Sequence, residues 1–388
     1  MTPAARLAAA AEILDQVLAG EAAEKALTGW ARGARYAGSK DRAAIRDHVF
    51  DALRCLTSFA ALGGGQTGRG LMLGMLRAEG RDPGALFTGE GHAPAPLSEA
   101  EGQPGELPQD AAARLDIPAW VWPQFTASLG DRAEAVAEVM RSRAPVFIRV
   151  NRALTTRAAL VDALAEEGIT ARPVDLARGA LEVTEGARRL QRTAAYEDGR
   201  FEMQDAASQA ICEAVPLADG MRVLDYCAGG GGKSLALGAR AELRLFAHDI
   251  APQRMKDLPA RARRAGLRVS LLDTDKVAGQ GPYDLVFCDV PCSGSGAWRR
   301  APEGKWRLDA ARLDELVTIQ AGILDLTAPL VAPGGRLAYA TCSLFEAENA
   351  AQIAAFLARA PGWRQEQSLA LTPLDGGDGF FLSQLVRA

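Results

Sequence analysis

The sequence is poor in the residues that build metal centres and disulfide frameworks. It holds only three histidines in 388 residues, and its six cysteines are scattered without a CxxC pair or a Cys/His cluster. This scarcity speaks against a zinc-binding module and against a small disulfide-stapled domain. We expect no bound metal, and free thiols that fit a reducing, cytoplasmic setting.

Long apolar runs are also missing. None reaches the ~20 residues that a membrane span needs, and residues 1–24 carry acids but no long apolar stretch. We therefore expect no membrane segment and neither a signal nor a transit peptide. Nothing in the sequence indicates an obligate dimer, and a monomer is the expectation.

A strong excess of positive charge is a third absence. The formal net charge is −4, whereas nonspecific nucleic-acid binders are usually basic. Two local stretches depart from this balance: residues 254–268 (RMKDLPARARRAGLR) and residues 299–307 (RRAPEGKWR). Each fits either a solvated helix face or a surface for a polyanion, and the charge pattern leaves both open.

What the chain does have is length and apolar content for more than one domain. Residues 1–110 show helical periodicity followed by a linker rich in glycine, proline and acids, and predict an all-α domain. Residues 111–205 place a capped helix between the strand-like runs VFIRVN and LEVTEG, and predict a small α+β module. Residues 206–388 alternate strand and helix, which predicts an α/β fold with a doubly wound, mostly parallel sheet.

A glycine-rich turn follows the first strand of this last region. The run VLDYCAGGGGKS places Gly229 to Gly232 before Lys233, where the backbone can approach a ligand closely. It is not a phosphate-binding Walker loop, because that pattern requires glycine where Cys227 stands. Asp249 closes the next strand, at the position where an acid binds ribose hydroxyls. This combination fits a dinucleotide or S-adenosylmethionine.

A third acidic position is expected after the third strand of the same region. Asp273 and Asp275 both qualify, and their spacing does not distinguish them.

Two later segments bring cysteines to strand ends. Asp289 and Cys292 lie in DVPCSGSG, and Cys342 lies in YATCS. Ligands of such sheets bind at the carboxyl ends of strands, so these side chains should meet in one crevice. A thiolate that adds to C6 of cytosine activates C5 for methylation, a carboxyl group near N3 offsets the developing charge, and a second thiol assists release. Cysteine is often a small buried apolar side chain, and we expect this of Cys55, Cys212 and Cys288.

With these residues in view, the chain resembles the bacterial Sun/Fmu (RsmB-like) and eukaryotic Nop/Sun family of RNA cytosine-C5 methyltransferases. The resemblance rests on residues 225–234, 289–296 and 341–343, and extends to residues 201–208, 300–306, 346–349 and 378–381. It is strong from about residue 146 onward. In the first 60 residues, SKDRAAIRDHVFDALR is similar to a NusB-like helical domain. The family implies a Rossmann-like class I methyltransferase domain at residues 206–388.

The resemblance implies a role for each matching residue. Cys342 would be the nucleophile on C6, Cys292 would assist release of the adduct, Asp289 would contact the cytosine, and Lys233 would line the same pocket. The expected cofactor, S-adenosylmethionine, would be surrounded by Cys227, Ala228, Gly229, Gly230, Gly231, Gly232, Lys233, Asp249, Arg254, Asp289 and one of Asp273 and Asp275.

One departure from the family pattern concerns the glycine loop, where Gly230 replaces a usual proline. Proline would stiffen the turn, so we expect somewhat weaker cofactor binding but not loss of activity.

RNA is the expected partner, with small-subunit rRNA favoured over tRNA. We expect the RNA surface at residues 254–268 and 299–307, helped by Arg149 and Asn151, while Trp298 and Trp306 fit either base stacking or core packing. Two rival functions remain. One is a methyltransferase that acts on DNA or on a small molecule, and the other is an RNA-binding assembly factor with a vestigial methyltransferase fold.

Overall fold

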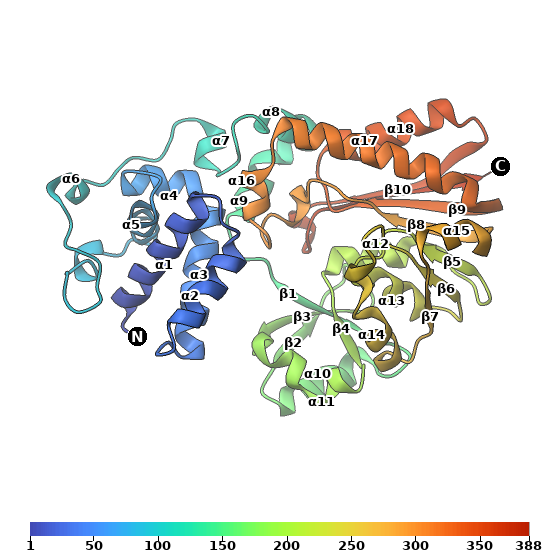
Figure 1. Ribbon diagram of the computed structural model, residues 1–388, viewed down its shortest axis with the longest axis horizontal. Helices are drawn as coiled ribbons and strands as arrows, with labels where there is room; N and C mark the ends of the chain where they lie inside the picture. Colours follow the sequence, from blue (N-terminus) through green and yellow to red (C-terminus); the bar gives the residue numbers. More distant parts are fainter. Residues whose placement is uncertain (388) are drawn as a thin grey trace. The chain divides into compact units, whose positions relative to one another are not determined.

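The computed structural model describes residues 1–387, which form two compact units (Figure 1). The first, here called the helical unit, comprises residues 1–143 and 298–307. Its α-helices are α1 (Pro3–Leu18), α2 (Ala23–Gly33), α3 (Ser39–Arg54), α4 (Leu56–Gly63), α5 (Gly68–Ala78), α6 (Glu99–Gly102), α7 (Ala111–Arg114), α8 (Trp122–Leu129), α9 (Ala133–Met140) and α16 (Glu303–Arg307). No helix within residues 1–387 is long and apolar enough to cross a membrane.

The core of the helical unit follows from apolar residues at helical spacing. In α1, Ile13, Leu14 and Val17 are buried against Ile45 and Val49 of α3, as the periodicity predicts. Residues 111–143, which were expected to belong to the α+β module, pack with the helical unit instead. The division into residues 1–110, 111–205 and 206–388 therefore stays a prediction.

The segment 298–307 lies in the helical unit, far in sequence from the rest of it. Lys305 is buried and its Nζ donates to the carbonyl of Arg54 at 3.0 Å, while the indole of Trp306 donates to the carbonyl of Leu53 at 2.7 Å. Arg299 is also buried and donates to the carbonyl of Arg143 at 3.1 Å. The expectation of an RNA surface at residues 299–307 is thus wrong for Arg299 and Lys305. Both side chains are buried inside the unit, where they donate hydrogen bonds to backbone carbonyls.

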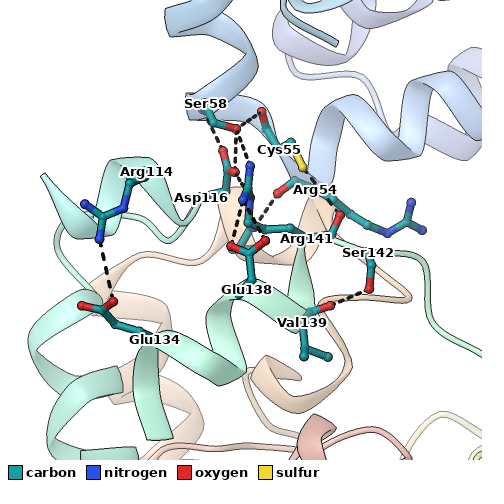
Figure 2. A network of polar contacts seen from close by, with 11 residues as sticks. Arg54, Cys55, Ser58, Arg114, Asp116, Glu134, Glu138, Val139, Arg141 and Ser142 are labelled. Atoms are coloured by element: carbon teal, nitrogen blue, oxygen red, sulfur yellow. Dashed lines mark hydrogen bonds and ion pairs between the residues drawn. The ribbon is translucent and has the colours of Figure 1, made fainter. Parts of the chain in front are cut away.

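A buried polar network supports this part of the helical unit (Figure 2). Asp116 is fully buried and accepts hydrogen bonds from the backbone and hydroxyl of Ser58, both at 2.8 Å, and an ion pair from Arg141 at 2.9 Å. Burial raises the pKa of Asp116, and Lys305 opposes that effect. Burial also lowers the pKa of Lys305 to about 8.

The second compact unit, here called the catalytic unit, comprises residues 144–297 and 308–388, of which residue 388 is not described. It begins with a four-stranded antiparallel sheet in the order β2-β3-β1-β4. The elements are β1 (Val146–Val150), α10 (Arg157–Glu166), β2 (Thr170–Pro173), β3 (Ala180–Glu185), α11 (Ala194–Glu197) and β4 (Phe201–Met203). This is the small α+β module expected from the sequence.

A seven-stranded sheet fills the rest of this unit, in the order β10-β11-β9-β8-β5-β6-β7. The five strands from β9 to β7 pair in parallel, whereas β10 and β11 are antiparallel. The strands are β5 (Arg222–Asp225), β6 (Arg244–Ala247), β7 (Val269–Leu271), β8 (Tyr283–Asp289), β9 (Val331–Thr341), β10 (Trp363–Leu371) and β11 (Phe380–Arg387). The helices are α12 (Ala206–Ala214), α13 (Gly232–Gly238), α14 (Leu258–Arg264), α15 (Thr274–Val277), α17 (Ala310–Thr327) and α18 (Ala350–Arg359).

Helices cover both faces of the large sheet (Figure 1). Alternate residues of β8 point to opposite faces: Leu285 and Phe287 join one apolar cluster with α12 and α13, and Val286 and Cys288 join another with α17 and α18. Both faces being buried explains the nearly continuous apolar run of this strand. The carboxyl ends of the parallel strands are left to form a site.

Candidate active site

A cavity of about 630 Å³ lies at the carboxyl ends of β5, β6, β8 and β9. It is lined by the glycine loop and by most of the residues singled out from the sequence. Its lining includes Gln204, Asp225, Cys227, Ala228, Gly229, Gly230, Gly232, Lys233, His248, Asp249, Arg254, Asp289, Cys292 and Cys342. Because β5, β8 and β9 are adjacent and parallel, Asp225, Asp289 and Cys342 reach the same edge of the sheet.

The glycine loop needs glycine at two of its positions. Gly229 and Gly231 have φ of 52° and 79°, a conformation that side chains disfavour. A Cβ on Gly231 would also lie 2.2 Å from Leu258. The carbonyl of Gly230 accepts a hydrogen bond from Arg261, which holds the turn at the position where the family usually has proline.

Asp249 secures the loop from the next strand. Its carboxylate accepts hydrogen bonds from the backbone N–H of Gly229 at 2.8 Å and of Ala251 at 2.9 Å, and Arg254 pairs with it at 3.1 Å. Both Asp249 and Arg254 line the cavity, and their contact with a cofactor stays a prediction.

Asp225, the last residue of β5, is a residue whose importance the sequence reasoning missed. Its Oδ2 accepts a 2.6 Å hydrogen bond from the Ser234 hydroxyl, but its buried Oδ1 has no hydrogen-bond partner. Burial raises the pKa of Asp225 to about 7, and the nearby charge of Asp289 acts in the same direction. A buried acceptor without a partner costs about 1–3 kcal/mol, so its persistence at a cavity wall indicates a ligand donor. Its position before a glycine loop was the available signal.

Lys233 and Asp289 form an ion pair with an Nζ–Oδ2 distance of 2.5 Å. Lys233 comes from the first turn of α13 and also lies over the ring of Phe380, 5.1 Å from its centroid. Burial opposes the charge on Lys233, but the Asp289 carboxylate outweighs it, and the pKa of Lys233 is raised. The pair therefore places a fixed cation and a carboxylate inside the cavity.

The two cysteines named from the sequence meet at the other side of the same cavity. The Sγ atoms of Cys292 and Cys342 are 3.4 Å apart. The hydrogen bond to Cys342, together with burial, raises the pKa of the Cys292 thiol well above its ordinary value. Cys227 also lines the cavity, and burial raises its thiol pKa.

A buried glutamate connects the segments that carry the two thiols. Glu348 accepts hydrogen bonds from the backbone and hydroxyl of Ser293, at 2.8 and 2.5 Å, and from the hydroxyl of Ser343. Each serine directly follows one of the two cysteines. In the sequence, Glu348 stands out only as part of residues 346–349, which resemble the family, and its role follows from the tertiary contacts.

The third acidic position is not brought to the site. Asp273 and Asp275 are exposed, and neither lines the cavity; Asp275 pairs with Lys276 at 3.1 Å. The neighbouring Thr274 contacts His248, a cavity residue, at 2.9 Å. The choice between the two aspartates as cofactor ligands stays a prediction without support from the geometry.

Some arginines of the basic stretch 254–268 form ion pairs within the protein. Arg261 and Arg264 pair with Glu202 of β4 at 2.8 and 2.5 Å. Asn151 is buried as well, and its amide donates to the carbonyls of Gly199 and Ala265. These contacts hold the small sheet against the large one, so Asn151 serves the fold rather than an RNA surface.

The fold and this cavity define a Rossmann-like methyltransferase with paired thiols at its strand ends. Two family models match the chain: 16S rRNA methyltransferase RsmB/F over residues 213–385, and the RsmF/B-like ferredoxin-like domain over residues 117–188. The ribosomal RNA small subunit methyltransferase B of Citrobacter koseri is 31% identical over 289 residues, which cover 71% of this chain and 67% of that protein. The chain belongs to the RsmB/F family of methyltransferases.

Solved structures show the same fold. The crystal structure of PH0851 matches with a TM-score of 0.74 and 21% identity, covering 99% of both chains. NSun6 from Pyrococcus horikoshii, solved with SFG, matches with a TM-score of 0.60 and 15% identity over 70% of this chain and 98% of that chain. The expected family, fold class and enzyme class are confirmed.

Proposed function

We propose that this chain transfers a methyl group from S-adenosylmethionine to C5 of a cytosine in RNA, through a covalent adduct between Cys342 and C6. The observation that carries the proposal is the pair of thiols, 3.4 Å apart, in the cavity that holds the glycine loop and the Lys233–Asp289 pair. Small-subunit rRNA is the proposed substrate, supported by the matching family model and by the name of the Citrobacter relative.

The cavity suits S-adenosylmethionine. The partnerless Oδ1 of Asp225 can accept from a cationic or hydroxyl donor, and the Gly229–Gly231 turn lets the backbone approach the ligand. We assign residues 227–233, Asp249, Arg254 and Asp289 to hold it. When bound, S-adenosylmethionine supplies an electrophilic methyl group.

The chain's own residues account for the remaining chemistry. Cys342 gives its thiol proton to solvent as its sulfur bonds to C6. The π electrons of the C5=C6 bond form the bond from C5 to the methyl group, and the electrons of the broken sulfur–methyl bond stay on the departing cofactor as a neutral thioether. Asp289, held by Lys233, hydrogen-bonds the N3 edge and offsets the developing charge. Loss of the C5 proton then restores the C5=C6 bond and expels the sulfur of Cys342.

Cys292 is assigned to the release step because of its place beside Cys342. Its Sγ lies 3.4 Å from that of Cys342, so the thiolate form of Cys292 is close enough to the adduct to take up the C5 proton as the sulfur of Cys342 departs. The two thiols line a cavity in the protein, so the target base has to leave its stack, or come from a single-stranded segment, to reach them.

The test is transfer of labelled methyl from S-adenosylmethionine to small-subunit rRNA, free and in assembled subunits, with tRNA and DNA alongside. We expect 5-methylcytosine in rRNA with the wild-type chain, and less than about one thousandth of that rate with Cys342→Ala. Cys288→Ala, on the same sheet but outside the cavity, should retain transfer. Equal labelling by the Cys342→Ala variant would refute the assigned nucleophile, and methylated tRNA or DNA alone would refute the assigned substrate.

The release step has its own test. Cys292→Ala should accumulate a covalent protein–RNA complex, visible as a shifted band under denaturing conditions, because the adduct forms but does not resolve. Cys292→Ala combined with Cys342→Ala should show no such band. Release of methylated RNA by Cys292→Ala at the wild-type rate would remove Cys292 from this role.

A further inference from the structure

A second cavity lies in the catalytic unit, outside the methyl-transfer site. It has a volume of about 740 Å³ and lies between the small sheet and helices α12 and α13. We call it the arginine cleft, because four of its lining residues are Arg149, Arg152, Arg178 and Arg240. The only acid that lines it is Glu213. The cleft is thus strongly positive in a chain whose net charge is −4.

Within residues 1–387, the four arginines of the cleft form no ion pair with a carboxylate. The carboxylate of Glu213 is engaged by the backbone N–H groups of Arg178 and Gly179, at 2.9 and 3.2 Å. The Arg240 guanidinium donates to backbone carbonyls of α12 and Val215. Burial lowers the pKa of Arg240, the charge of Glu213 opposes that effect, and the charge of the neighbouring Arg178 adds to it. An anion in the cleft would stabilise the charged form of Arg240.

A buried amide at the wall of the arginine cleft points to a ligand as well. The Nε2 group of Gln209 donates to the carbonyls of Ile148 and Gln204, at 3.2 and 2.9 Å. These two acceptors determine which end of the amide carries nitrogen. The Oε1 atom therefore faces away from them, and it is buried without a hydrogen-bond partner. A hydroxyl on a ligand, directly or through water, can satisfy it, whereas a phosphate cannot donate.

One hydrogen bond between two side chains, Arg149 and Gln204, connects the arginine cleft to the methyl-transfer cavity. Arg149, buried in the cleft wall, donates its Nε–H to Oε1 of Gln204 at 2.7 Å. Gln204 in turn lines the methyl-transfer cavity and donates to Ser208 at 3.2 Å. This contact places the wall of the arginine cleft next to a lining residue of the methyl-transfer cavity.

We propose that the arginine cleft binds the sugar–phosphate backbone of the RNA substrate, with the arginines on phosphate oxygens and Gln209 on a ribose hydroxyl. The inference rests on the proposed function, since it names a subsite for the same substrate. Guanidinium groups bind phosphate with paired N–H donors, and a 2′-hydroxyl is the group that distinguishes RNA from DNA. The net negative charge of the chain does not prevent RNA binding at the arginine cleft, because the positive charge of the cleft acts locally.

The test uses the double variant Arg152→Ala/Arg178→Ala, whose exposed side chains make no hydrogen bond within the described residues. We expect the KM for RNA to rise about tenfold or more at physiological salt, and the slope of log Kd against log salt to fall by roughly 1 to 2. The kcat at saturating RNA and the affinity for S-adenosylmethionine should stay unchanged. The matched control is Arg244→Ala/Arg364→Ala, which removes two exposed arginines of the large sheet that do not line the cleft.

A second variant tests the cleft without changing charge. A Cβ on Gly179 would lie 3.7 Å from Oε1 of Gln209 and meets no atom closer than 3.6 Å, so Gly179→Ala should fold normally. Its methyl group should weaken RNA binding and reduce the preference for RNA over the 2′-deoxy oligonucleotide of the same sequence.

The outcomes separate the two proposals. Wild-type KM and salt slope in the double variant, with wild-type preference in Gly179→Ala, would overturn the arginine cleft while 5-methylcytosine formation by the wild-type chain still supported the proposed function. A wild-type chain that neither bound nor methylated RNA would overturn both.

Discussion

Each compact unit of this protein contains a cluster of buried charge, and the two clusters differ in how completely they are hydrogen-bonded. In the helical unit, Asp116 is paired with Arg141 and with two donors of Ser58. In the catalytic unit, Asp225 leaves one carboxylate oxygen without a partner. Burial raises the pKa of both aspartates. A perturbed pKa therefore does not distinguish a structural cluster from a ligand site, whereas an unsatisfied atom beside a cavity does.

The same contrast holds for two lysines. Lys305 donates to a backbone carbonyl and burial lowers its pKa to about 8, while Lys233 pairs with a cavity carboxylate and its pKa is raised. Both lie in segments that resemble the family, yet only Lys233 reaches the site. The comparison predicts that changes in the helical cluster affect stability and changes in the cavity cluster affect activity.

The largest expected effect is on catalysis. Asp289→Asn keeps the shape of the side chain but weakens the contact with Lys233 and removes the charge beside the reacting base. We expect kcat to fall by about 10²- to 10³-fold, with a loss of less than about 2 kcal/mol in stability because the pair is partly exposed. Methyl-transfer kinetics and urea unfolding measure the two quantities. A stability loss as large as that expected for Asp116→Ala would contradict the distinction between a structural cluster and a ligand site.

Asp116→Ala is the counterpart in the helical unit. It leaves Arg141 and Ser58 without their buried acceptor, so the free energy of unfolding should fall by about 3–5 kcal/mol. Tryptophan fluorescence during urea unfolding reports on this unit, because every tryptophan except Trp363 belongs to it. The exposed Asp131→Ala is the control. Affinity of the folded protein for S-adenosylmethionine should not change.

Glu348 combines features of both clusters, because it is a buried acid with hydrogen-bonded oxygens and it contacts the segments that carry the thiols. Glu348→Ala should slow transfer by about 10- to 100-fold and lengthen the life of the covalent RNA adduct, since the two cysteines lose their common support. Glu348→Gln should restore much of the activity because it keeps the shape and the Oε1 acceptor. Affinity for S-adenosylmethionine should stay constant in both, as Glu348 does not line the cavity.

Controls for this positioning role are available nearby. The exposed Glu346→Ala changes the same charge two residues away and should behave as wild type. The opposite result is that Glu348→Ala lowers only the fraction of folded protein and leaves the lifetime of the adduct in the folded molecules unchanged. That result would show that Glu348, like Asp116, contributes to stability and does not position the thiols.

The smallest expected effect is a pH dependence. The pKa of Asp225 is raised to about 7, so the carboxyl group becomes charged as pH rises through 7. Affinity for the cationic S-adenosylmethionine should increase severalfold between pH 6 and pH 8, and Asp225→Asn should abolish this step in a calorimetric titration. The stability sign is opposite: the folded state retains a proton that the unfolded state releases above about pH 4, so the protein loses stability between about pH 4 and pH 7, and this contribution no longer changes above pH 7. A flat wild-type profile would contradict the assignment of Asp225.

Much of the site could be predicted from the sequence because it depends on strand ends. Asp289, Cys292 and Cys342 follow parallel strands, and the carboxyl ends of such strands meet at one edge whatever the loops do. The alternation of strands and helices determined the doubly wound fold in the same way. Positive φ at Gly229 and Gly231 explains why the turn between β5 and α13 is rich in glycine.

Other features were decided only by the tertiary structure. Residues 298–307 read as a basic surface, yet Arg299 and Lys305 are buried in the helical unit, because a charge pattern does not reveal which backbone carbonyls will receive its donors. Glu348 joins the two thiol-bearing segments because it contacts Ser343, 5 positions away, and also Ser293, 55 positions away along the chain. Local sequence determines where a chain turns and which residue types stand at strand ends, whereas the desolvation and partners of each charge arise only when distant segments pack together.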